Sequence, residues 1–205
     1  LSVPIYSASV YSFANADEGA ALHDGSKEGY YYGRLGNPTQ AALENAVAEL
    51  EGAEQAIALA SGMAAVSGVV LSLVKSGDHI VAPRSMYSTT TNFLNHIDER
   101  FGIETTFVDA TDAENYRVAA KPNTRLFWIE TPTNPLVLVT DIAAVASIAK
   151  ELGVLTITDN TFATPFNQLP LSLGVDAVIH SATKYLGGHS DLTAGVIAGS
   201  VEVVD

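Results

Sequence analysis

The chain of 205 residues contains no cysteine, which excludes thiol catalysis, disulfide bonds and cysteine-based zinc sites. It is also poor in basic residues, with 10 Lys and Arg against 23 Asp and Glu, so its formal net charge is −13. Such a surface repels phosphate backbones and anionic lipid, and we therefore expect neither nucleic acid nor a membrane as a partner. The apolar runs are too short to span a bilayer and no secretory signal pattern is present, so we expect a cytoplasmic protein.

Apolar residues, in contrast, make up 47% of the chain, enough to bury a substantial core in one or two domains. Residues 1–36 show little periodicity and are rich in Tyr, Ser and Gly, which predicts an extended arm. Beyond them, Asn37-Pro38 predicts the start of one helix, and Asp141 predicts the N-cap of another over 141–152.

Between the helical patterns lie short apolar runs that lack strict alternation. The seven strand candidates are 55–60, 79–82, 103–108, 126–130, 154–158, 177–180 and 194–198. Strands of this kind, interleaved with helices, are typical of an α/β fold with a mostly parallel sheet between helices.

Polar groups follow four of these strands, and ligands of open α/β sheets bind at the carboxyl ends of the strands. The four groups are Ser61-Gly62-Met63, Glu130 to Pro135, Asp159-Asn160-Thr161 and Ser181-Ala182-Thr183-Lys184. Any one of them is compatible with an ordinary loop or helix cap. Four at one edge of a sheet favour a binding site.

Among the five lysines, only Lys184 directly follows a buried strand candidate. We expect it to be partly desolvated there, so that it loses its proton more easily than an exposed lysine does. An amine in that state is a plausible nucleophile.

The other polar groups suggest what such an amine acts on. Ser61-Gly62 stands at a strand-to-helix junction, where free amides suit a phosphate, and Ser181 and Thr183 offer further hydroxyl donors. Asp159 is expected to be a partly buried acid that needs a cationic partner, and a protonated ring nitrogen serves as one. Together with Lys184, these groups indicate a pyridoxal phosphate site.

Two other enzyme or binding classes find little support in the sequence. The five histidines show no metal-ligand spacing, so we expect no metal site and no metallohydrolase. A nucleotide-binding Rossmann protein requires G-x-G-x-x-G after its first strand, and that motif does not occur.

At this point a family resemblance emerges. The run from Ser181 to Asp191, with Lys184 inside it, resembles the lysine signature of the Cys/Met-metabolism (trans-sulfuration) family of pyridoxal phosphate enzymes. Further matching motifs, in the family's order, are Tyr32-Gly33-Arg34, Ala60 to Met63, Glu130 to Pro135 and Asp159-Asn160-Thr161. The resemblance covers essentially the whole chain.

The resemblance implies an aspartate-aminotransferase-like (fold type I) architecture. Residues 37–205 are then the pyridoxal phosphate-binding large domain, and residues 1–36 are the arm that contacts a neighbouring subunit. Members of the family also have a smaller C-terminal domain, which carries the arginine that binds the substrate carboxylate. We do not expect that domain within this chain, because the chain ends soon after the lysine signature.

The resemblance also implies roles for individual residues. Lys184 carries the cofactor and moves protons, Asp159 pairs with the ring nitrogen, and Tyr87 stacks on the ring. The other residues expected to contact the cofactor within the same chain are Ser61, Gly62, Met63, Asn134, Thr161, Ser181 and Thr183.

Tyr32 and Arg34 are expected to reach the phosphate of a neighbouring subunit, with Tyr32 also near the amino-acid substrate. A site shared in this way implies a homodimer, usually paired again into a homotetramer.

For the reaction, the motifs resemble those of cystathionine γ-lyases and γ-synthases, which implies γ-elimination or γ-replacement on sulfur amino acids or homoserine esters. Methionine γ-lyases typically carry a cysteine where Thr89 stands. A methionine γ-lyase or a homoserine-ester sulfhydrylase stays open as an alternative. An alternative from another class also stays open, namely a truncated, non-catalytic module that binds the cofactor or serves assembly.

Overall fold

The computed structural model describes residues 3–204, and the chain divides between Ala46 and Val47 into two compact units. In the first unit, helix α1 (Ala16–His23) begins at Asn15, whose side chain accepts a hydrogen bond from the Glu18 amide at 2.9 Å. The prediction of an extended arm over residues 1–36 is therefore wrong at α1. The helix is short and largely made of small residues, so it leaves no apolar stripe in the sequence.

Helix α2 (Pro38–Glu51) starts where the Asn37-Pro38 pair predicted. The Asn37 side-chain oxygen accepts a hydrogen bond from the Thr39 amide at 2.8 Å, which satisfies one of the free donors of the first turn. Proline is tolerated at the first helical position because its missing N–H has no partner to lose there.

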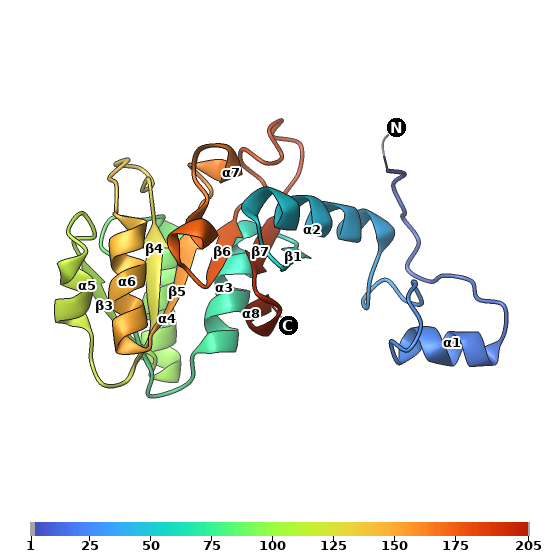
Figure 1. Cartoon of the computed structure of the whole chain (residues 1–205), viewed down its shortest axis with the longest axis horizontal. Coiled ribbons are helices and arrows are strands. Elements are labelled where there is room, and N and C mark those ends of the chain that lie inside the picture. Colours follow the sequence, from blue (N-terminus) through green and yellow to red (C-terminus); the bar gives the residue numbers. More distant parts are fainter. Residues whose placement is uncertain (1–2, 205) are drawn as a thin grey trace. The chain divides into compact units, whose positions relative to one another are not determined.

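A sheet of seven strands forms the centre of the second unit (Figure 1). The strands are β1 (Gln55–Leu59), β2 (His79–Pro83), β3 (Glu104–Val108), β4 (Thr124–Glu130), β5 (Leu155–Asp159), β6 (Ala177–His180) and β7 (Gly195–Gly199). Their order is β1-β7-β6-β5-β4-β2-β3, and only β7 runs antiparallel to its neighbours β1 and β6. The predicted strands are confirmed, each within two residues at its ends.

Helices cover both faces of the sheet, and the period-two alternation of side chains distributes the core between them. On β4, Leu126 and Trp128 pack toward α3 (Gly62–Leu73) and α4 (Ser88–Phe101). Phe127 and Ile129 pack toward α5 (Glu114–Ala119) and α6 (Ile142–Leu152). Burial on both faces explains why the strands read as continuous apolar runs.

Helix α6 begins at the predicted N-cap, since the Asp141 side chain accepts a hydrogen bond from the Ala144 amide at 3.0 Å. Its last turn ends at Gly153, whose positive φ of 67° suits a residue without Cβ. The remaining helices are short: α7 (Thr164–Asn167), α8 (Val201–Val204) and the 3₁₀ helix at Pro170–Leu173.

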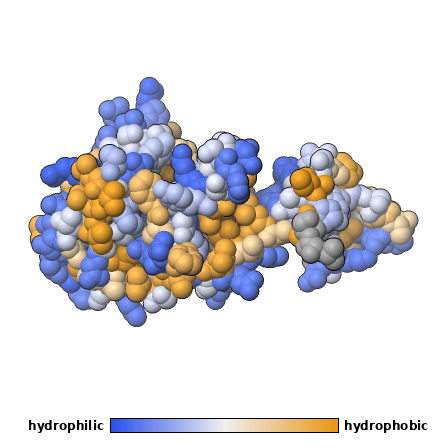
Figure 2. Space-filling model, turned by 90° about the horizontal axis from the view of Figure 1, so that it is seen from above, coloured by the Kyte–Doolittle hydropathy of each residue, from blue (hydrophilic) through white to orange (hydrophobic). Residues whose placement is uncertain are grey.

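The surface mixes hydrophilic and hydrophobic residues (Figure 2). Four consecutive apolar residues after β4, Leu136 to Val139, are exposed. Across residues 3–204, helices long and apolar enough to span a bilayer are absent.

The position of β7 depends on one close approach, between Gly195 and the start of α3. A Cβ atom at Gly195 would lie 2.1 Å from the Ser61 carbonyl oxygen, whereas one at Gly68, inside α3, would lie 3.8 Å from its nearest neighbour. We expect Gly195→Ala to lower the free energy of unfolding by about 2–3 kcal/mol through overpacking. Gly68→Ala, the matched control, should raise it by about 0.5–1 kcal/mol. Urea unfolding of both variants measures this, and equal stabilities would contradict the close approach.

Candidate functional site

A cavity of about 310 Å³ lies at the carboxyl ends of β4, β5 and β6, beside the start of α3. It contains ten of the twelve residues predicted to bind the cofactor: Ser61, Gly62, Met63, Tyr87, Asn134, Asp159, Thr161, Ser181, Thr183 and Lys184. Five further residues complete its wall: Val66, Glu130, Pro132, Phe162 and Ile179. Segments more than 120 residues apart in sequence meet here because parallel strands bring their carboxyl ends to one edge.

A second hollow, of about 520 Å³, lies at the ends of β2 and β3. Arg84, Asp109 and Leu136 are among its lining residues, and none of the predicted site residues lines it. Size therefore does not identify the site, whereas the chemistry of the lining residues does.

Tyr32 and Arg34, the other two predicted residues, belong to the first compact unit. Within that unit both are exposed, and the Arg34 guanidinium lies over the Tyr32 ring at 5.2 Å from its centroid. Their predicted contact with a neighbouring subunit stays a prediction.

Two buried acids stand side by side in the cavity wall, because the register of β4 and β5 sets Glu130 opposite Asp159. Glu130 is 4% exposed and Asp159 8% exposed. Burial raises the pKa of Asp159. Three effects oppose that rise in its pKa: the side-chain hydrogen bond of Thr161, the hydrogen bond from the Thr161 amide to the Asp159 carboxylate at 3.0 Å, and the charge of nearby His180.

Glu130 holds two parts of the cavity wall in place. Its carboxylate accepts hydrogen bonds from the Tyr87 amide at 2.9 and 3.0 Å and from the Asn134 amide at 2.8 Å. Burial, together with the negative charge of Asp159, raises the pKa of Glu130 to about 7. Sequence reasoning assigned no role to Glu130, since its bond to Tyr87 joins residues 43 positions apart.

The start of α3 supplies hydrogen-bond donors at the cavity. The Ser61 hydroxyl caps the helix by accepting from the Ala64 amide at 3.1 Å. The amides of Gly62 and Met63 belong to the first turn, where no intrahelical acceptor exists. A Cβ at Gly62 would lie 2.6 Å from both Cβ and Oγ of Ser181, so only glycine lets the Ser181 hydroxyl approach these amides.

Thr183 is tied to the backbone of the strand that follows. Its hydroxyl donates to the Ala194 carbonyl at 3.1 Å and accepts from the Ala194 amide at 3.0 Å. It lines the cavity, but its hydrogen is already engaged there.

Lys184 lines the cavity, yet it is exposed, so the expectation that it is desolvated is wrong for this chain. The physical reason is the turn that carries it. The Lys184 amide donates to the Ser181 carbonyl at 3.0 Å, and the Gly188 amide donates to the Lys184 carbonyl at 2.8 Å. These bonds place the lysine in a turn beyond the end of β6 rather than on the buried strand.

The groups around the cavity fit pyridoxal phosphate. Gly62, Met63 and Ser181 offer uncommitted donors for a phosphate in a cradle that a Cβ would fill. Asp159 is a buried acid suited to a ring cation, and Lys184 presents an amine.

Comparison with known families agrees with this chemistry. The model of the family described as Cys/Met metabolism PLP-dependent enzymes matches residues 1–204. The chain belongs to this family. Its fold is accordingly that of the large domain of fold type I enzymes, in which a mostly parallel sheet lies between helices.

Individual relatives are also similar. The chain is 46% identical over its whole length to an L-methionine gamma-lyase of Treponema denticola, of which it covers 52%. It is 49% identical to a cystathionine gamma-lyase of Bacillus subtilis (strain 168), with 96% of this chain and 50% of the relative covered. The chain thus spans about half the length of the curated relatives it matches.

A solved structure matches as well. It is that of a protein described as an O-acetylhomoserine (thiol)-lyase (metY) of Campylobacter jejuni, with N'-pyridoxyl-lysine-5'-monophosphate in its chain. The TM-score is 0.91 at 35% identity, and the match covers 98% of this chain and 50% of that chain.

The raised pKa of Glu130 leads to a prediction about stability. The folded protein holds this proton up to about pH 7, whereas the ordinary value of 4.5 applies to an unfolded chain. The folded state therefore binds more protons between these values, and the free energy of unfolding falls as the pH rises through this window. Glu130→Gln should make that fall smaller.

Urea unfolding of the cofactor-free, full-length protein between pH 5 and 7.5 measures the effect. Glu99→Gln, which removes an exposed carboxylate from α4, is the control and should leave the slope unchanged. A Glu130→Gln variant with the same slope as the unsubstituted protein would show that Glu130 does not hold the proton.

Proposed function

We propose that the protein is a pyridoxal phosphate-dependent lyase or transferase that carries out γ-elimination or γ-replacement on sulfur amino acids or homoserine esters. The observation that supports this most is the content of one cavity. A lysine, a buried aspartate, an aromatic side chain and the free amides of a helix start all line it. Any one of these features is common; their combination is the minimum that the cofactor's aldehyde, ring and phosphate require.

The residues that would hold the group follow from their chemistry. Lys184 would bind it covalently, Asp159 would face the ring nitrogen, and Tyr87 would lie against the ring. The amides of Gly62 and Met63, with the Ser181 hydroxyl, would hold the phosphate. When bound, the cofactor supplies an electron sink that stabilises negative charge at the substrate Cα.

The protein's own groups then position and move protons. The Lys184 amine takes a proton from the substrate Cα and delivers it to a neighbouring carbon, as a general base and acid. With the cofactor bound, the negative charge of Asp159 would favour the protonated form of the ring nitrogen. Glu130 holds the Tyr87 backbone, and thereby the aromatic wall, against the cavity.

Within the family we favour a cystathionine γ-lyase or γ-synthase type of reaction. Thr89 stands where methionine γ-lyases typically carry a cysteine, which argues against that activity. The relatives carry names of both kinds of γ-lyase, so methionine γ-lyase and homoserine-ester sulfhydrylase stay as alternatives.

We further propose that Tyr32 and Arg34 complete the site of a neighbouring subunit, in a homodimer that pairs into a homotetramer in the cytoplasm. Both side chains are exposed, which leaves them available for such a contact.

Covalent attachment of the cofactor tests the proposed function. The full-length protein should absorb visible light after addition of pyridoxal phosphate, and borohydride should fix the cofactor on the peptide that contains Lys184. Lys184→Ala should abolish the fixation, because the amine is lost. Lys150→Ala, which removes an exposed lysine from α6, should leave it unchanged. Peptide mass spectrometry measures the outcome.

The same preparations are then compared on cystathionine, methionine and homoserine esters. A colourless full-length protein, or a label on another lysine, would overturn the assignment. Turnover of methionine in preference to cystathionine would overturn only the choice within the family.

Subunit mixing tests the shared site. Arg34→Ala should weaken cofactor binding about tenfold or more, since a charged hydrogen bond to phosphate is lost. When an Arg34→Ala chain exchanges subunits with a Lys184→Ala chain, a mixed dimer has one site with both residues intact. About a quarter of all sites should then recover in a fully exchanged equal mixture. Absence of recovery in mixtures that have demonstrably exchanged would reject the shared site.

A further inference from the structure

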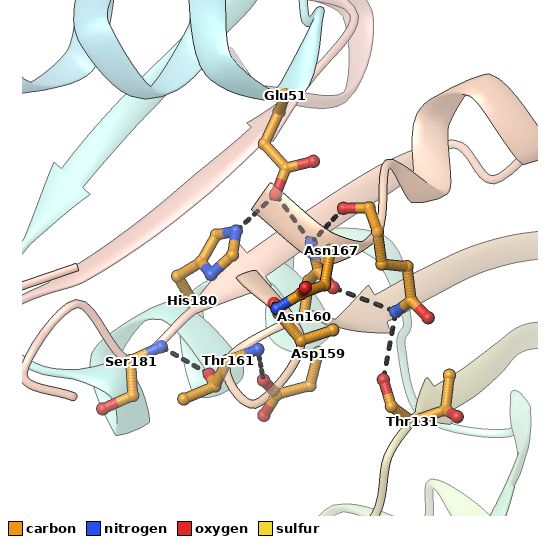
Figure 3. A network of polar contacts seen from close by, with 10 residues as sticks. Glu51, Thr131, Asp159, Asn160, Thr161, Asn167, His180 and Ser181 are labelled. Atoms are coloured by element: carbon orange, nitrogen blue, oxygen red, sulfur yellow. Dashed lines mark hydrogen bonds and ion pairs between the residues drawn. The ribbon is translucent and has the colours of Figure 1, made fainter. Parts of the chain in front are cut away.

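A buried polar cluster lies at the carboxyl ends of β5 and β6, and Figure 3 shows its contacts. At its centre Glu51, the last residue of α2, has a fully buried side chain. Its Oε1 lies 2.5 Å from Nε2 of His180, which is 1% exposed, and accepts a hydrogen bond from the Asn160 side-chain amide at 2.8 Å.

The cluster ties three strand ends together. Asn160 follows β5, and its side chain exchanges hydrogen bonds with Gln168: the Asn160 amide donates to the Gln168 carbonyl at 3.0 Å, and the Gln168 side-chain amide donates to Asn160 Oδ1 at 2.9 Å. That Gln168 amide also donates to the carbonyl of Thr131, just after β4, at 3.0 Å. With His180 at the end of β6, the ends of β4, β5 and β6 share one network.

Strand alternation places this network relative to the cavity. Asp159 and its register partner Ile179 both line the cavity. Asn160 and His180 are the next residues, so their side chains point to the opposite side. Figure 3 shows His180 between Glu51 and the segment that carries Asp159 and Thr161. The imidazole therefore stands directly behind the acid that faces the cavity.

A mechanical tie alone does not require charged residues here. Burial of a carboxylate and an imidazole costs free energy, and neutral amides can form the same bonds at lower cost. Glu51 Oε2 and His180 Nδ1 have no hydrogen-bond partner among residues 3–204. Hydrogen bonding alone therefore does not account for a carboxylate and an imidazole at this place. A Glu–His pair differs from an amide pair in one respect: its imidazole can carry a positive charge beside a carboxylate.

That charge acts on Asp159 in a definite direction. The ionisable groups that line the cavity around Asp159 are Tyr87, Glu130 and Lys184. Burial disfavours the charged form of Asp159, while the hydrogen bonds of Thr161 and the charge of His180 favour it. The charged form of Asp159 is therefore stabilised in part by His180, on the side of the sheet away from the cavity.

We propose that His180, kept protonated by Glu51, is a positioning residue that supports the Asp159 carboxylate from the far side of the sheet and so keeps the shared proton on the cofactor ring nitrogen rather than on Asp159. This inference rests on the proposed function. The negative end of the Asp159–ring pair lies nearer to the His180 cation than the positive end does, so the cation favours that charge-separated arrangement. Without the cation, the proton moves toward Asp159.

The experiment uses the full-length protein loaded with pyridoxal phosphate that carries ¹⁵N in its ring, because the ¹⁵N chemical shift reports the protonation of that atom. In His180→Gln the signal should move from the protonated toward the unprotonated position. The ratio of protonated to unprotonated ring nitrogen should change about tenfold for each unit by which the cation shifts the pKa of Asp159. His180→Lys retains a cation beside Glu51 and should restore the original position.

Two further variants separate charge from mechanical support. Gln168→Ala breaks the tie to Thr131 without a change of charge, so it should lower the unfolding temperature but leave the ¹⁵N signal in place. If His180→Gln does not fold, the double variant Glu51→Gln, His180→Gln removes both charges together and should move the signal in the same direction, by less, because the anion is removed as well. Thermal unfolding confirms the folded state of each variant.

The outcomes are distinguishable. A ¹⁵N signal at the same position in the unsubstituted protein and in the folded His180 variants would overturn the role of His180, while the proposed function stands. Failure of the unsubstituted protein to bind the labelled cofactor would overturn the proposed function itself.

Discussion

The register between β4 and β5 sets Glu130 opposite Asp159, and the cavity is organised around these two buried acids. Two carboxylates at this spacing in a poorly hydrated site repel each other, so their environments must differ for both to be tolerated. Glu130 is surrounded by backbone amides and has a pKa raised to about 7, whereas Asp159 has the Thr161 amide and the nearby His180. One acid is therefore suited to hold a wall of the cavity, and the other to face a cation.

The start of α3 suits a negative charge instead, because free amides rather than acids line the cavity there. Close backbone approach makes this possible: Gly62 admits Ser181, and Gly195 admits the Ser61 carbonyl. Glycine at these two positions serves the site and the sheet at once, since β7 closes against the same turn that presents the donors. A group with a phosphate at one end and a basic ring nitrogen at the other matches both kinds of lining.

Much of this arrangement was predictable. The apolar runs located all seven strands within two residues, and the polar groups that follow four of them contain nine of the ten predicted residues in the cavity wall. The tenth, Tyr87, was predicted from the family resemblance. Two predictions were wrong for physical reasons. Helix α1 lacks the apolar stripe that reveals a helix. Lys184 is exposed because it lies in the turn after β6 and not on the buried strand itself.

By itself, the sequence determined the order of strands and helices, the positions of the polar groups after the strands, and the family to which those motifs belong. These features are local, because periodicity and capping act over a few residues. Only the tertiary structure decided that Glu130 supports Tyr87, that Glu51 reaches His180 across 129 positions, and that Asp159 lies between a cavity and the buried Glu51–His180 contact. Such relations arise from strand register and helix packing, which join residues that no local pattern connects.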